Sequence, residues 1–121
     1  MLMKLGMKTI LPVAALALTV GTGRPLAAAG QDEAQIKRGQ EVYTAQKCSL
    51  CHQIAGKGNK ASPLDGVGKK LSADEIRQWI TDPVAMAAKV KSTKKPVMQN
   101  KYSKLPAADI DALVAYMQSL K

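Results

Sequence analysis

The pentapeptide Cys48-Ser49-Leu50-Cys51-His52 constrains this chain more than any other part of its sequence. Two cysteines three positions apart, followed directly by a histidine, form the attachment signature of c-type haem. Each thiol can add across one vinyl group of a porphyrin, and the histidine then places an imidazole nitrogen over the iron. A chain built on this motif folds around a large apolar plate. Such a plate would give a core to a chain that has no phenylalanine, one tryptophan and three tyrosines.

Two other chemistries use a pair of cysteines at this spacing. A structural zinc site takes four ligands, whereas this chain offers only Cys48, Cys51 and His52 as thiolate or imidazole donors, and the last two are adjacent. A thioredoxin-like redox pair lies at the start of a helix within a βαβ unit, and no stretch of this chain alternates like a strand. Haem attachment is therefore the favoured interpretation, with a disulfide or redox pair as the remaining alternative.

The first residues are typical of an export signal. Lys4 and Lys8 precede an apolar run over residues 9–20, which is too short to span a bilayer, and Ala27-Ala28-Ala29 then offers small residues for cleavage. We therefore expect a signal peptide over 1–29 and a mature domain over 30–121. The mature domain would lie in the periplasm without stable membrane insertion. An uncleaved anchor is the alternative.

The mature part is basic, and its excess charge is concentrated late in the chain. From residue 30 onward there are fifteen lysine and arginine residues against nine aspartate and glutamate residues, a formal charge of +6. No acidic residue occurs between Asp82 and Asp109. A solvated loop and a docking surface for an acidic partner both fit this pattern. Nucleic acid does not, because the chain has neither a recognition motif nor an aromatic platform for bases. The lysines of this segment are Lys89, Lys91, Lys94, Lys95, Lys101 and Lys104.

The mature part shows helical periodicity and no strand pattern, so we expect an all-α fold. Two predicted helix starts have the spacing of a capping box. The second of these helices should end at Asp82, because Pro83 follows. The predicted elements are, in order, a helix from Asp32 and Gln35 to the haem motif, a loop over 53–68, a helix from Ser72 and Glu75 to Asp82, a short helix over 84–90, an irregular segment over 91–104 and a helix from Pro106 onward.

The sixth ligand of the iron decides what such a haem does. His52 is the only histidine, so a second histidine ligand from the same chain is excluded, and a methionine, a lysine or an open position remain. Met117 lies on the apolar stripe of the last predicted helix, which favours a place in the core. Met86 lies in an alanine-rich stretch with helical character. Met98 follows Pro96-Val97 in the irregular segment and has no such stripe, so we expect it to be the ligand.

From about Gln31 to Lys121 the chain resembles a small class I c-type cytochrome of the bacterial periplasm. In that family the haem motif lies near the mature N-terminus, a Pro-Leu-x-Gly segment follows, and a methionine precedes the last helix. Here these correspond to residues 48–52, to Pro63-Leu64-Asp65-Gly66 and to Met98. The resemblance implies a cytochrome c-like helical domain wrapped around one covalent haem c. This chain departs from the pattern at Gln99, where many members have a proline.

The resemblance also implies roles for individual residues. The motif cysteines would carry the thioethers, and His52 would be the proximal ligand. The other ring nitrogen of His52 would donate a hydrogen bond to the carbonyl of Pro63. The alternative for Pro63 is an ordinary turn proline. Trp79 would pack by the haem and hydrogen-bond a propionate, or be a buried core anchor. Tyr102 would donate a hydrogen bond near the haem or merely cover it. The family's crossing of first and last helices would involve Gly39, Tyr43, Leu113 and Tyr116.

Ligation by histidine and methionine in an apolar pocket raises the reduction potential of a haem. The sequence therefore predicts a one-electron carrier with redox protein partners, acting as a monomer and not as an enzyme. A haem sensor with an open sixth position is one alternative, although four-helix cytochromes of that kind carry the motif near the C-terminus. A haem enzyme or a cytochrome subunit of a larger dehydrogenase is the other. An enzyme would need polar acid or base groups over an open distal face.

Overall fold

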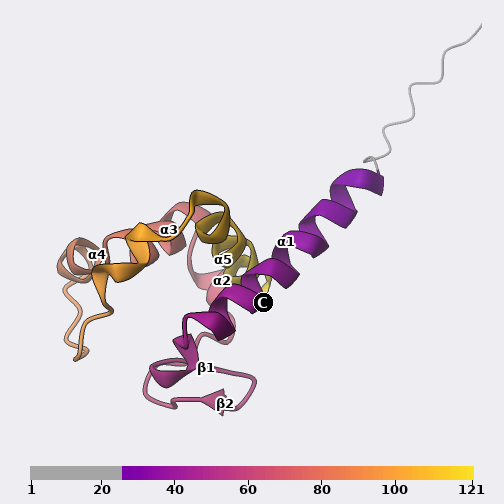
Figure 1. The fold of residues 1–121 in the computed structure, drawn as a ribbon. Helices are drawn as coiled ribbons and strands as arrows, with labels where there is room; N and C mark the ends of the chain where they lie inside the picture. Colours follow the sequence, from indigo (N-terminus) through magenta and orange to yellow (C-terminus); the bar gives the residue numbers. More distant parts are fainter. Residues whose placement is uncertain (1–25) are drawn as a thin grey trace, which may run out of the picture.

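The computed structural model describes residues 26–121, with side chains from residue 32 onward. The predicted leader over 1–29 therefore lies almost wholly outside the described residues. None of the helices within 26–121 combines the length and apolar character needed to cross a membrane. The elements are α1 (Leu26–Ala45), η1 (Cys48–Leu50), β1 (Gln53–Ile54), β2 (Lys57–Gly58), α2 (Val67–Lys70), α3 (Ala73–Thr81), α4 (Pro83–Lys89), η2 (Asn100–Lys104) and α5 (Ala107–Ser119), as Figure 1 shows.

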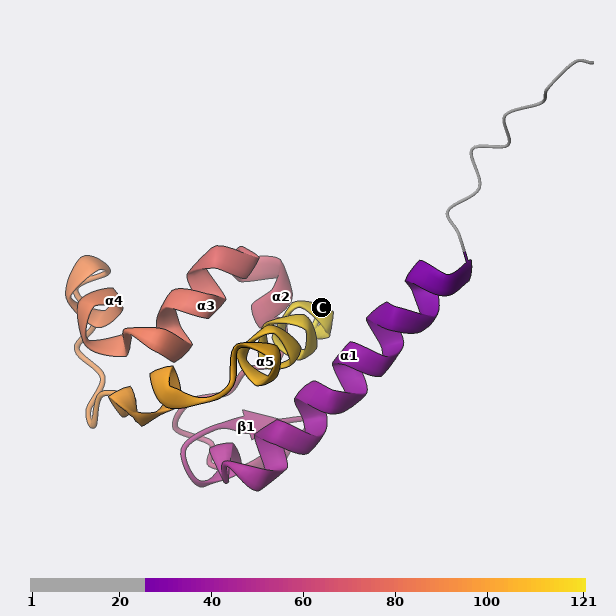
Figure 2. The same cartoon turned by 45° about the horizontal axis from the view of Figure 1, so that its top comes forward.

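Helices α1 and α5 cross at close range and form the centre of the fold (Figure 2). Gly39 makes this approach possible, because a Cβ atom there would lie 2.6 Å from Cβ of Tyr116. One turn further along α1, the ring of Tyr43 meets Tyr116 edge to face, with centroids 5.8 Å apart at 83°. Leu113 is buried in the core beneath them. The helix crossing implied by the resemblance is therefore present in the structure.

The start of the first helix was predicted wrongly. The spacing of Asp32 and Gln35 indicates a cap, yet α1 already runs from Leu26, so both residues lie inside the helix. Leu26-Ala27-Ala28-Ala29 consists of strong helix formers, and their propensity carries the helix back past the capping signal. A local capping motif thus marks a possible helix start without preventing an earlier one.

A small antiparallel ribbon occupies part of the predicted loop over 53–68. Gln53 pairs with Gly58, and Ile54 pairs with Lys57. The two residues between the strands, Ala55 and Gly56, both have positive φ (50° and 77°), as a tight two-residue hairpin turn requires. The expectation of no strand is wrong for this ribbon, whose strands are too short to show alternation. The fold remains all-α.

Helices α3, α4 and α5 begin within one residue of their predicted starts. Helices α2 and η2 were not predicted: α2 begins in the expected loop over 53–68, and η2 lies in the segment 91–104 that was expected to be irregular. Ser72 and Glu75 form the complete capping box of α3, and Asp82 ends that helix and accepts a hydrogen bond from the amide of Ala85 in α4. The apolar faces of α1, α3 and α5 then meet in one core cluster. Its buried members are Val42, Ile76, Ile80, Ile110, Leu113, Val114 and Met117.

Candidate haem site

The haem motif follows directly on the end of α1. Lys47 has a left-handed backbone (φ 55°) that turns the chain from α1 into the short helix η1, and the amide of His52 donates to the carbonyl of Cys48 at 3.0 Å. Both cysteines are free thiols; Cys48 is half-buried and Cys51 is exposed. Burial raises the pKa of the Cys48 thiol to about 11. The motif therefore presents two unpaired sulfurs and an imidazole on one compact turn.

His52 is half-buried, and its ring is held by one hydrogen bond. Nδ1 lies 3.1 Å from the carbonyl oxygen of Ser62. A carbonyl can only accept, so Nδ1 carries the proton and Nε2 keeps the lone pair that a metal needs. Burial lowers the pKa of His52, which also favours the neutral ring that can ligate iron.

The acceptor for His52 was predicted one residue too late. The carbonyl belongs to Ser62 and not to Pro63. The reason lies in the register of the chain, because Pro63 forms an isolated parallel bridge with Gln53. In this bridge the amide of Gln53 donates to Ser62 O at 3.2 Å, while Leu64 N donates to Gln53 O at 2.8 Å. The Ser62 carbonyl is thereby turned toward the haem motif.

Asn59 is a site residue that the sequence did not single out. Its side-chain amide donates to Leu50 O at 3.1 Å, and its backbone amide donates to His52 O at 3.0 Å. Its side-chain oxygen accepts from the amide of Ala61 at 2.9 Å. Asn59 thus ties the loop that carries Ser62 to the haem motif itself. The available signal was an Asn after Gly58, a pair typical of tight turns.

The three methionines considered as ligands occupy different environments. Met86 in α4 and Met117 in α5 are buried in the protein core, with 4% and 7% of their surfaces exposed. Met98 lies in the irregular segment between α4 and η2 and is only partly buried. The predicted core positions of Met117 and the helical position of Met86 are confirmed. Of these three methionines, only Met98 has a side chain that is not buried in the core.

Tyr102 and Trp79 differ in how they are placed. Tyr102, in η2, packs against the core cluster, and burial together with the nearby Cys48 and Cys51 raises its pKa. It therefore lies close to the haem motif, with the ammonium of Lys101 5.2 Å from its ring centroid. Trp79 in α3 is partly buried but is not among the residues that form or pack against the core cluster. This placement does not support the alternative of a buried core anchor for Trp79.

The available donors fit a covalently attached haem. They comprise the free thiols of Cys48 and Cys51, the Nε2 of His52 and a thioether outside the core at Met98. By contrast, no group of three or more His, Cys, Asp or Glu side chains in the described part of the chain is placed to hold a bare metal ion. The donor set therefore matches haem c better than zinc.

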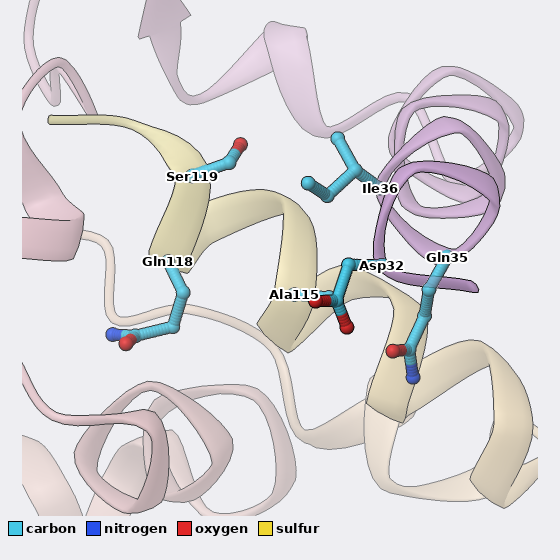
Figure 3. A pocket seen from close by; sticks show the side chains of 6 residues that line it. All are labelled: Asp32, Gln35, Ile36, Ala115, Gln118 and Ser119. Atoms are coloured by element: carbon cyan, nitrogen blue, oxygen red, sulfur yellow. The ribbon is translucent and has the colours of Figure 1, made fainter. Parts of the chain in front are cut away.

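A surface cavity of about 290 Å³ lies elsewhere, between α1 and α5 (Figure 3). None of the predicted haem residues contributes to it. Its lining consists of Asp32, Gln35, Ile36, Ala115, Gln118 and Ser119.

Comparison with known proteins agrees with this site. Cytochrome c oxidase subunit 2 of Alkalihalophilus pseudofirmus (strain ATCC BAA-2126 / JCM 17055 / OF4) is 26% identical over 98 residues, covering 74% of this chain and 27% of that protein. The chain thus spans about a quarter of the length of this relative. No solved structure matches the chain. The family model described as Cytochrome c matches residues 36–121, which include the whole haem motif, Met98 and the crossing of α1 and α5. The chain therefore belongs to the cytochrome c family and binds covalently attached haem c.

Proposed function

We propose that this protein is an exported one-electron carrier whose haem is held by His52 and Met98. The observation that carries the proposal is the arrangement of the two donors. The ring of His52 is fixed through Ser62 with Nε2 free, and Met98 is the partly exposed methionine of the segment before α5. The bound haem supplies an iron that gains or loses one electron. A thioether ligand stabilises its reduced state, so we expect a raised reduction potential.

The same two residues support a carrier without catalytic activity. If His52 and Met98 occupy both axial positions, the chain leaves no place on the iron for a substrate. The hydrogen bond from His52 to Ser62 holds the ring in one orientation, and Asn59 holds the loop that supplies this acceptor. Little then has to move when an electron arrives, which favours transfer over chemistry on a bound molecule. We propose that the mature chain acts as a monomer in the periplasm.

The lysine-rich segment supports an acidic redox partner. All six lysines between Asp82 and Asp109 are exposed. Lys89 ends α4, and the other five flank Met98 in the sequence. The exposed Leu50, with 70% of its surface free, lies between the motif cysteines. Positive charge near the haem motif, from Lys94 bonded to Ala61 and from Lys101 acting on the Cys48 thiol, would steer a negatively charged partner toward this exposed apolar residue. A role within a larger assembly is the second candidate, favoured by the similarity to an oxidase subunit.

Substitution of each methionine tests the proposed ligand. Leucine has nearly the volume of methionine but no sulfur, so Met98→Leu removes a ligand with little change in packing. The ferric protein should show the weak long-wavelength charge-transfer band of an iron to sulfur bond, and Met98→Leu should abolish it. Met86→Leu and Met117→Leu are matched controls and should keep the band. A wild-type protein that is high-spin and binds carbon monoxide readily would instead favour a sensor or an enzyme.

A further inference from the structure

The two proposed iron ligands belong to segments with little connection between them. His52 lies in the motif lobe, which we define as residues 48–66, with η1, β1 and β2. Met98 lies in the methionine segment, which we define as residues 91–99, between α4 and η2. Figure 2 shows the methionine segment as a loop beyond α4 and the motif lobe at the end of α1. Contacts between these segments would determine how firmly Met98 is held as an iron ligand.

One hydrogen bond bridges them. The ammonium Nζ of Lys94 donates to the carbonyl oxygen of Ala61 at 3.4 Å. Within residues 26–121, it is the one hydrogen bond that joins residues 91–104 to the motif lobe. The charge of Lys94 also reaches His52, since it contributes to the lowered pKa of that ring. Lys94 therefore spans the gap between the two segments at the haem motif.

Both ends of this bridge are themselves anchored. On the motif side, the amide of Ala61 donates to Asn59, whose own backbone amide donates to His52 O. On the other side, the amide of Lys94 donates to Ser92 Oγ at 3.3 Å, and Ser92 N donates to Ala87 O in α4 at 2.9 Å. A continuous chain of hydrogen bonds thus runs from α4 through Lys94 to the haem motif. A side chain that merely extended into solvent would have no such connection.

We propose that Lys94 is a positioning residue that closes the methionine segment against the motif lobe and so limits how often Met98 moves away from the iron. This inference rests on the proposed function, in which Met98 is the ligand. A hydrogen bond from a charged donor contributes modestly at an exposed position, and the contact here is long. We therefore expect loss of Lys94 to raise the rate of segment opening about twofold to fivefold.

Three variants isolate this effect. Lys94→Ala removes the bridge, and Lys94→Arg keeps a charged donor at the same position. Lys95→Ala removes the same charge from the neighbouring exposed residue, for which no hydrogen bond occurs in the described part of the chain. Two rates are measured on the haem-loaded protein. One is imidazole binding to the ferric iron at saturating imidazole, and the other is chymotrypsin cleavage after Tyr102, which reports local opening.

Lys94→Ala should raise both rates about twofold to fivefold and lower the guanidinium midpoint only slightly, while Lys94→Arg and Lys95→Ala should stay near wild type in all three measurements. Equal rates for Lys94→Ala and Lys95→Ala would overturn the inference. Imidazole binding that is no faster in Met98→Leu than in wild type would instead remove the proposed Met98 ligation. In that case the cleavage rate, which does not depend on the iron ligand, decides by itself whether Lys94 closes the segment.

Discussion

Because α1 and α5 cross so closely at Gly39, we expect Gly39→Ala to destabilise the protein, although helix propensity alone predicts stabilisation. Replacing a helical glycine by alanine ordinarily stabilises a helix by about 1 kcal/mol, because glycine loses more backbone freedom on folding. At Gly39 the new Cβ would lie 2.6 Å from Cβ of Tyr116 and 2.8 Å from the carbonyl carbon of Ala112. Carbon atoms pack at about 3.5 to 4.0 Å, so the two helices would have to separate by about 1 Å.

That separation is costly because the two groups that the new Cβ meets cannot swing aside: one is the backbone carbonyl of Ala112 and the other is Cβ of Tyr116, which is fixed to the backbone. The Ala112 carbonyl cannot rotate away without breaking the α5 helix, and the shift would loosen the edge-to-face pair of Tyr43 and Tyr116. Overpacking of this kind costs about 1 to 3 kcal/mol beyond the gain in propensity. For a domain of about 90 residues we expect Gly39→Ala to lower the thermal midpoint by at least 4 °C.

The assay is thermal and guanidinium unfolding of the haem-loaded protein, followed by far-ultraviolet circular dichroism. Gln40→Ala is the matched control, since Gln40 is the next residue on α1 and is exposed; its change should stay within about 0.5 kcal/mol. Stabilisation of Gly39→Ala by about 1 kcal/mol would refute the close helix approach on which this account of the fold depends.

Three further predictions concern the cysteines, the capping box and the lysines. In the haem-free protein, iodoacetamide should modify the exposed Cys51 faster than Cys48, whose thiol is half-buried with a pKa raised to about 11; equal rates by mass spectrometry would contradict the burial of Cys48. The pKa of Glu75 is lowered by its hydrogen bonds with Ser72, so its stabilising contribution is present above its ordinary pKa and is lost as the pH falls through the lowered value. Ser72→Ala should therefore lower the thermal midpoint more at pH 7 than at pH 3, and an equal loss at both values would count against the capping box. The pair Lys95→Gln and Lys104→Gln should slow oxidation of the ferrous protein by ferricyanide about threefold at low salt, whereas the same change at Lys69 and Lys70 should have less effect; a wild-type rate independent of salt would remove the steering argument.

Local patterns predicted the elements whose causes are local. The capping box at Ser72 and Glu75 and the proline after Asp82 specify boundaries through neighbouring residues, and both appear as expected. The apolar stripe of α5 likewise predicts that Met117 is buried. These features depend on spacing along one helix, which the sequence displays directly.

Features that depend on tertiary register could not be predicted in the same way. The acceptor for His52 is Ser62 and not Pro63 because an isolated bridge between Gln53 and Pro63 turns the preceding carbonyl toward the ring. The contact between Lys94 and Ala61 joins residues 33 positions apart, and no periodic pattern in the sequence predicts it. A pattern of residue types identifies which donors exist, whereas the folded backbone decides which acceptor each one reaches.

The most direct test of iron ligation by Met98 is the proton spectrum of the ferrous haem-loaded protein with labelled methionine methyl groups. A methyl group bound through its sulfur to the iron lies over the porphyrin plane, so the ring current should move its signal far upfield. Ligation by Met98 predicts one such methyl signal, which disappears in Met98→Leu and persists in Met86→Leu and Met117→Leu. An upfield methyl signal that survives Met98→Leu, or a wild-type spectrum without one, would contradict ligation by Met98.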